Sequence, residues 1–159
     1  FEASSIGIDQ GRLNGVPIKH AVYLNLSRDH FDYHQNLENY LMAKKRLIED
    51  QQLETLVFNA DQPEFIESFK NLDVKNIFKI SNKNKAADIF YQTKNCDLNG
   101  KITFTAQTPW GEFDAEAKIF SEYTEKFLSH FVQFSFVASL NVIKTICFLI
   151  FSFSKNLLY

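Results

Sequence analysis

The densest group of side chains able to carry out chemistry is the run from Ser27 to His34, directly after an apolar stretch at residues 19–26. This run combines hydroxyl, guanidinium, carboxylate and imidazole groups. His30 and His34 are four residues apart, a spacing that suits zinc if both lie on one helix. No third zinc ligand stands out beside them. The alternative interpretation is therefore a solvated polar loop.

Lys44 is the second candidate. A helix is expected over residues 37–50, with Asn36 as its N-cap. Lys44 falls on the apolar face of this helix, whereas Lys45 and Arg46 point elsewhere. Either Lys44 lies at the edge of that face and extends its ammonium into water, or it is held near a site where burial favours a reactive neutral amine. The apolar face comprises Leu37, Tyr40, Leu41, Leu47 and Ile48.

Two further groups of polar residues suit binding. The start of the chain offers hydroxyl, amide and guanidinium donors, which together can hold an anionic substrate. Asn59 and Asp61 follow an apolar run at 54–58, where helix capping is the alternative role. No phosphate-binding loop of the form G-x-x-x-x-G-K-[ST] is present. The donors at the start are Ser4, Ser5, Gln10 and Arg12, and the Glu2 carboxylate precedes them.

The order of the strands and helices expected around these residues predicts an α/β fold. Short apolar strands alternate with helices, a pattern typical of a parallel sheet, and ligands bind beyond the carboxyl ends of such strands. From Ile89 to Ile119 the apolar period becomes two, which predicts an antiparallel meander with turns at Asn99-Gly100 and Pro109-Trp110-Gly111. The strands are expected at 19–26, 54–58 and 76–80, and the helices at 37–50 and 62–71.

Residues 120–159 differ from the rest. This tail holds eight of the 17 phenylalanines and only five charged residues. We expect it to be an out-of-frame or aberrant ending that is apolar and helical, and we assign residues 1–119 to a separate partial domain. Residues 131–154 are long enough to span a bilayer, but Lys144 near the middle makes a membrane span unfavourable.

Composition narrows the function classes. The chain has 159 residues, 17 Lys and Arg against 19 Asp and Glu, and a net charge of −2. This balance gives no basic surface for nucleic acid. Two cysteines are too few for a disulfide framework and favour a reducing, cytoplasmic location. A start at Phe1 without a signal peptide predicts a piece of a longer chain.

Four stretches, read together, resemble the Mur ligases of peptidoglycan synthesis, and within them the tripeptide synthetases. The run Ser-Arg-Asp-His-Phe-Asp-Tyr-His is the most specific of the four. The resemblance extends from Phe1 to about Ile119 and corresponds to most of the central ATPase domain. The stretches are Glu2-Ala-Ser-Ser-Ile-Gly-Ile-Asp-Gln-Gly-Arg12, Leu24-Asn-Leu-Ser-Arg-Asp-His-Phe-Asp-Tyr-His34, Tyr40-Leu-Met-Ala-Lys-Lys-Arg-Leu47 and Asn59-Ala-Asp61.

The resemblance implies an ATP-dependent ligase that joins diaminopimelate or lysine to UDP-MurNAc-L-Ala-D-Glu through an acyl phosphate. It implies Mg²⁺ and ATP as cofactors, and a full-length protein that is a monomer. Glu2, His30 and a carbamylated Lys44 would hold the metal, with His30 and Lys44 as the catalytic residues. By the same resemblance, Ser4, Gln10 and Arg12 would contact the UDP-peptide, and Asn59 the nucleotide.

The sequence also departs from the family. Ile6 stands where a histidine often follows the serine pair, and Gln62 stands where the family more often has aspartate. The segment after Phe120 lacks the expected Gly-x-Phe-Asn. Because nothing in this chain can cradle the phosphates of ATP, we expect the fragment alone to be inactive. A non-catalytic remnant that at most binds UDP-peptide or a partner is the alternative function.

Overall fold

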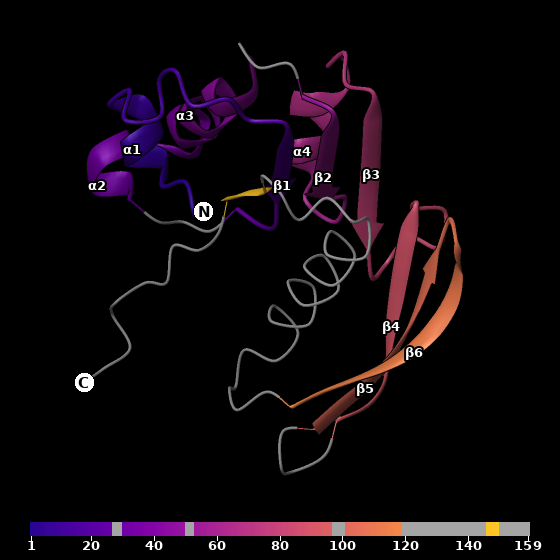
Figure 1. The fold of residues 1–159 in the computed structure, drawn as a ribbon. Helices are drawn as coiled ribbons and strands as arrows, with labels where there is room; N and C mark the ends of the chain where they lie inside the picture. Colours follow the sequence, from indigo (N-terminus) through magenta and orange to yellow (C-terminus); the bar gives the residue numbers. More distant parts are fainter. Residues whose placement is uncertain (27–29, 50–52, 97–100, 119–145, 150–159) are drawn as a thin grey trace, which may run out of the picture.

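The structure is a computed structural model that describes residues 1–26, 30–49, 53–96, 101–118 and 146–149. Four helices and seven strands lie within these residues (Figure 1). The helices are α1 (Ser5–Asp9), α2 (Phe31–His34), α3 (Leu37–Glu49) and α4 (Pro63–Phe69). The strands are β1 (His20–Tyr23), β2 (Thr55–Asn59), β3 (Asn76–Ser81), β4 (Ile89–Cys96), β5 (Lys101–Thr108), β6 (Gly111–Lys118) and β7 (Ile146–Leu149).

The strands form one mixed sheet in the order β6-β5-β4-β3-β2-β1-β7. β1 pairs in parallel with β2, and β2 with β3. β4 also runs parallel to β3, and from β4 onward the pairing becomes antiparallel through β5 to β6. The predicted α/β region followed by an antiparallel meander is thereby confirmed. β1 is shorter than the predicted strand at 19–26, and α1 was not predicted.

The helix boundaries follow from local chemistry. Asn36 caps α3, because its Oδ1 accepts the N–H of Asn39 at 2.8 Å, as the sequence predicts. α4 begins at Pro63, whose missing N–H costs nothing in the first turn of a helix. These two helices cross from β1 to β2 and from β2 to β3, which is the connection that neighbouring parallel strands require.

The turn between β5 and β6 also follows the prediction. Thr108 pairs with Gly111, so Pro109 and Trp110 form a two-residue connection. Gly111 has a φ of 135°, a value that side chains with a Cβ rarely adopt. The Thr108 hydroxyl donates to the Gly111 carbonyl at 2.8 Å and closes the turn. The other predicted turn, at Asn99-Gly100, lies outside the described residues.

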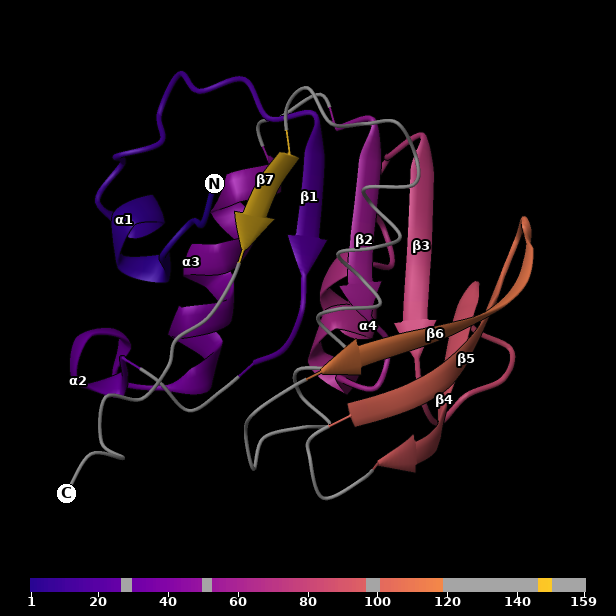
Figure 2. The same cartoon turned by 60° about the horizontal axis from the view of Figure 1, so that its bottom comes forward.

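Both faces of the parallel sheet are buried. Successive side chains of β1 alternate between the two faces, so that Ala21 and Tyr23 lie in one core and Val22 in the other. The first core is covered by α1, α3 and α4, and the second by the meander strands β4 and β5 (Figure 2). Burial on both faces explains why the parallel strands read as continuous apolar runs.

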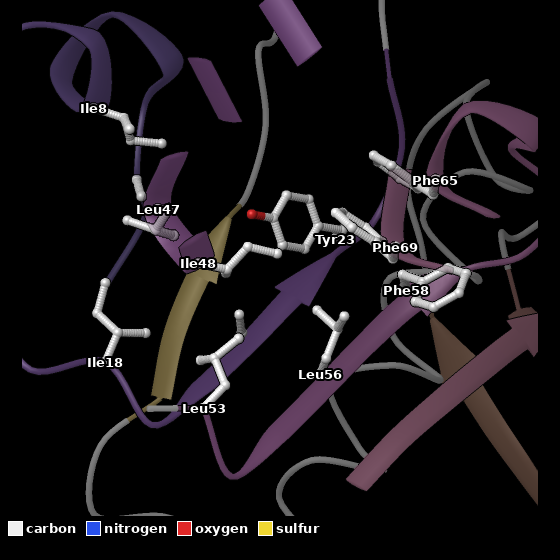
Figure 3. Packing of buried hydrophobic residues seen from close by; sticks show 12 residues of the cluster. Ile8, Ile18, Tyr23, Leu47, Ile48, Leu53, Leu56, Phe58, Phe65 and Phe69 are labelled. Carbon is white, nitrogen blue, oxygen red and sulfur yellow. The ribbon is translucent and has the colours of Figure 1, made fainter. Parts of the chain in front are cut away.

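Tyr23 lies at the centre of the helix-covered core. Its ring packs edge-on against Phe65 and Phe69 of α4, with centroids 5.5 and 4.7 Å away. In Figure 3 this ring lies between those phenylalanines and the α3 side chains Leu47 and Ile48. β1, α3 and α4 therefore share one packed core, and α3 has a fixed position over the sheet.

The tail differs from the prediction where the structure describes it. Ile146–Leu149 form β7, which pairs in parallel with β1, so these four residues form a strand rather than part of an apolar helix. β1 would otherwise be an edge strand with unpaired backbone groups, which explains why an apolar segment pairs there. The rest of the tail lies outside the described residues. No helix in the described part of the chain is long and apolar enough to cross a membrane.

The fold predicts a contrast between two aliphatic residues. Leu56 on β2 is fully buried, and Leu56→Ala should lower the free energy of unfolding by about 2–5 kcal/mol through the cavity that it leaves. Ile66 on α4 is 45% exposed, and Ile66→Ala should change it by less than about 0.5 kcal/mol. Urea denaturation monitored by circular dichroism measures both. Equal losses would contradict the placement of β2.

Candidate functional site

The expected substrate-contact residues lie on and around α1. Ser4 is its N-cap, and the Ser4 Oγ accepts the N–H of Gly7 at 3.0 Å. Gln10 is the C-cap, and Arg12 follows two residues later, where its N–H donates to the Gly7 carbonyl at 2.9 Å. Ser4, Gln10 and Arg12 are all exposed, so their polar groups can reach a ligand. The three residues therefore lie at the two ends of α1 and in the turn directly after it.

The segment after β1 places His30 and His34 differently from a zinc-binding helix. His30 is half-buried and precedes α2 with a φ of 55°, outside the helix itself. His34 is the last residue of α2 and is buried. Among the described residues, no group of three or more His, Cys, Asp or Glu is arranged to hold a metal ion. The zinc alternative therefore has no structural support there.

Lys44 is buried on the inner face of α3, as the helical spacing predicts. Lys44 is 8% exposed, and its Nζ lies 5.0 Å from the centroid of the Tyr40 ring. Lys45 instead forms a 3.5 Å ion pair with Glu49 one turn later. Of the two alternatives for Lys44, the structure favours burial over extension into water.

A hydrogen bond from the sheet fixes the position of the Lys44 backbone relative to β1. The Tyr23 hydroxyl donates to the backbone carbonyl of Lys44 at 2.8 Å, and the contact is buried. This bond crosses from β1 to α3, between residues that are 21 apart in sequence. Sequence reasoning did not find it, since Tyr23 reads as an ordinary apolar strand residue.

His34 connects α2 to α1. Its Nε2 lies 2.9 Å from the Oγ of Ser5, which is 1% exposed. Burial lowers the pKa of His34 below its ordinary value, while the nearby Asp9 carboxylate partly opposes this shift. The His34 imidazole is therefore neutral near pH 7, when it has one donor and one acceptor nitrogen. Sequence reasoning considered His34 only as a zinc ligand.

A second polar network lies at the carboxyl ends of β2 and β3. The Asp61 carboxylate accepts hydrogen bonds from the Ser81 hydroxyl and from the N–H of Asn82. Ser81, which is fully buried, also accepts the N–H groups of two following residues. Asn59 Oδ1 accepts the N–H of Asp61 at 2.9 Å, which orients the Asn59 amide. The N-cap of α4 is Gln62, so Asn59 does not cap this helix, and its side chain instead holds the turn that leads to Asp61.

A hollow of about 630 Å³ lies beside α1 and the end of α3. Asp9 and Arg46 line it and form a 2.6 Å ion pair with each other. The residues expected to bind substrate, metal and nucleotide do not line this hollow. It is therefore separate from the group around Lys44.

The burial of His34 predicts a pH dependence of stability. His34 has a lowered pKa when folded, so below its unfolded value of about 6.5 the unfolded chain binds more protons. The free energy of unfolding should therefore decrease as the pH falls below about 6.5. Above that pH, the contribution of His34 should not change with pH. Urea denaturation at pH 7.5 and pH 5.5 measures the difference.

His34→Gln should reduce this loss without abolishing it, because burial also lowers the pKa of His20. His20→Gln is the matched control and should remove the remaining part that comes from His20. An unchanged pH dependence in His34→Gln would contradict the assignment.

Comparison with known proteins identifies the family. Residues 1–126 match the Mur ligase middle domain. Over 123 residues the chain is 36% identical to the UDP-N-acetylmuramoyl-L-alanyl-D-glutamate--2,6-diaminopimelate ligase of Haemophilus influenzae, a match that covers 70% of this chain and 23% of the relative. The ligase of the same name from Chromobacterium violaceum is 34% identical, with coverage of 77% and 25%. The chain thus spans about a quarter of the length of these relatives.

Solved structures agree. A UDP-N-acetylmuramoyl-L-alanyl-D-glutamate--2,6-diaminopimelate ligase superposes with a TM-score of 0.75 at 33% identity, covering 90% of this chain and 29% of that one. The MurF ligase of Thermotoga maritima in complex with ADP has a TM-score of 0.60 at 14% identity, with coverage of 79% and 28%, and shows the shared fold alone. The chain therefore belongs to the Mur ligase family, and its residues 1–126 correspond to part of the middle domain of that family.

Proposed function

We propose that this chain is part of a cytoplasmic ATP-dependent ligase that joins diaminopimelate to UDP-MurNAc-L-Ala-D-Glu. Family membership and the names of the relatives at 34–36% identity support this reaction. The structural observation that carries the proposal is the burial of Lys44 on α3. A lysine is rarely buried without a specific reason, because desolvation of its ammonium is costly.

Helix α1 supplies the groups that would bind the UDP-peptide. This substrate carries phosphates and carboxylates, and a guanidinium such as that of Arg12 binds these anions through paired hydrogen bonds. The Ser4 hydroxyl and the Gln10 amide add neutral donors from the two ends of the same helix. Because the three residues lie at the two ends of α1 and in the turn directly after it, they would orient the substrate as a unit.

The Glu2 carboxylate suits Mg²⁺, which prefers oxygen ligands. Glu2 is exposed and His30 is half-buried, so a carboxylate and an imidazole are available to an ion. Mg²⁺ commonly keeps several waters and binds one or two protein groups together with substrate phosphates, so a small protein ligand set is sufficient. When bound, the ion would neutralise charge that develops on the transferred phosphoryl group.

Lys44 would complete this set as a carbamate. The ammonium first loses one proton to solvent. The neutral amine nitrogen then forms a bond to the carbon of carbon dioxide and releases a second proton, so that the cation is replaced by an anion. The face of the Tyr40 ring stabilises the unmodified ammonium by about 0.5–2 kcal/mol, so the carbamate must gain more than this from the cations around it. A carbamate oxygen would also serve as a metal ligand.

Asn59 would contact ATP. Its Oδ1 already accepts the Asp61 N–H, so its Nδ2 would be the atom that contacts the nucleotide. The Asn59 side chain would therefore act as a donor to an acceptor atom of the nucleotide. The network through Asp61 and Ser81 would keep it in place.

A hybrid ligase tests the proposal. Residues 1–126 replace the matching segment of the Haemophilus influenzae ligase, and phosphate release that depends on diaminopimelate is measured. Lys44→Ala should reduce activity by at least about tenfold to a hundredfold, because it removes the carbamate that serves the metal. Lys45→Ala should change activity less than about twofold, since its exposed pair with Glu49 contributes little.

Short carboxylates added to the Lys44→Ala hybrid should restore part of the activity by supplying the missing oxygens. Equal tolerance of both alanine substitutions would remove Lys44 from the site. A folded hybrid without activity, with the parent ligase active under the same conditions, would favour a non-catalytic remnant that at most binds UDP-peptide.

A further inference from the structure

We propose that His34 is a positioning residue that holds α1 at a fixed place relative to α3. This inference rests on the proposed function, in which α1 carries the substrate contacts and α3 carries Lys44. His34 lies between these helices in sequence and contacts both of them. Its role would be to set the distance and orientation between substrate and lysine.

The first observation is the link to α1. The His34 Nε2 and the Ser5 Oγ are 2.9 Å apart, and both residues are buried, at 5% and 1% exposure. Ser5 is the first residue of α1 and follows Ser4, whose side chain caps the helix. A hydrogen bond to Ser5 therefore fixes the turn that presents Ser4.

The second observation is the link to α3. The His34 carbonyl accepts a hydrogen bond from the Asn39 side chain at 2.9 Å, within the first turn of α3. The His34 ring packs edge-on against Tyr40 at 5.5 Å. The same Tyr40 ring lies 5.0 Å from the Nζ of Lys44. One aromatic ring thus separates His34 from Lys44.

The third observation is the backbone around His34. Positive φ values occur at His30 (55°) and Gln35 (68°), on either side of α2, and neither residue is glycine. Such conformations are unfavourable and persist where the surroundings determine them, most often at functional sites. The buried His34 side chain is the part of α2 that anchors this turn to the rest of the molecule.

A second, exposed connection joins the same elements and provides a control. Asp9 at the end of α1 pairs with Arg46 of α3 at 2.6 Å and accepts the hydroxyl of Tyr33 at 3.0 Å. The Arg46 side chain is 55% exposed, and exposed ion pairs contribute little. The buried contact of His34 should therefore carry most of the polar coupling between α1 and α3.

Hydrogen exchange on the 159-residue chain tests the link directly. His34→Phe keeps a ring against Tyr40 but removes the nitrogen beside Ser5, so the α1 amides of Ile8 and Gln10 should exchange about tenfold faster. His34→Gln places a polar atom near the position of Nε2 and should restore most of the protection. Arg46→Ala should leave exchange within about twofold.

Two results would overturn the proposal. One is that His34→Phe leaves the exchange rates of the α1 amides unchanged, and the other is that Arg46→Ala raises these rates as much as His34→Phe does. If His34→Phe does not fold, Ser5→Ala removes the same hydrogen bond from the other side and should give the same faster exchange. Unchanged exchange in Ser5→Ala would equally overturn it.

The hybrid ligase tests the consequence for the reaction. His34→Phe should raise KM for UDP-MurNAc-L-Ala-D-Glu about tenfold and leave KM for ATP unchanged, and His34→Gln should restore it. A purely structural role would change the amount of folded enzyme and leave both KM values as they were, which would overturn the positioning role. An inactive parent hybrid would count against the proposed function, while hydrogen exchange would still decide whether His34 holds α1.

Discussion

The hydrogen bond from the Tyr23 hydroxyl to the Lys44 carbonyl is the contact on which the candidate site depends. It is buried, 2.8 Å long, and joins β1 to the middle of α3. Loss of a buried partner costs about 1–3 kcal/mol, so this bond opposes sliding of the helix along the sheet. The packing of Tyr23 against α4 keeps its hydroxyl aimed at α3. The backbone position of Lys44 is thus set by the sheet.

The two-sided burial of the sheet explains how the chain combines a rigid frame with accessible polar groups. Helices α1, α3 and α4 cover one face, and the meander packs against the other. The polar residues gather at the carboxyl ends of β1, β2 and β3, where the strands stop and loops begin. Loops held by such a frame commonly carry the functional groups of α/β proteins.

Some of this could be predicted from sequence, and the reason is periodicity. Helical spacing placed Lys44 on the inner face of α3, and alternation of apolar residues identified the meander. α1 is only five residues long, too short to show a period, and was missed. The contacts of His34 with Ser5 and of Asp61 with Ser81 join segments 29 and 20 residues apart. No local pattern encodes such pairs, so they required the structure. The roles of Glu2, Ser4, Gln10, Arg12 and Asn59 remain predictions.

The most direct test of the proposed site is detection of the carbamate on Lys44. The hybrid ligase is equilibrated with ¹³C-labelled bicarbonate and Mg²⁺, and its ¹³C NMR spectrum is recorded. Carbamylation of Lys44 predicts one carbamate carbon signal that is present in the parent hybrid, retained in Lys45→Ala and lost in Lys44→Ala. An active hybrid without this signal, or a signal that persists in Lys44→Ala, would contradict it.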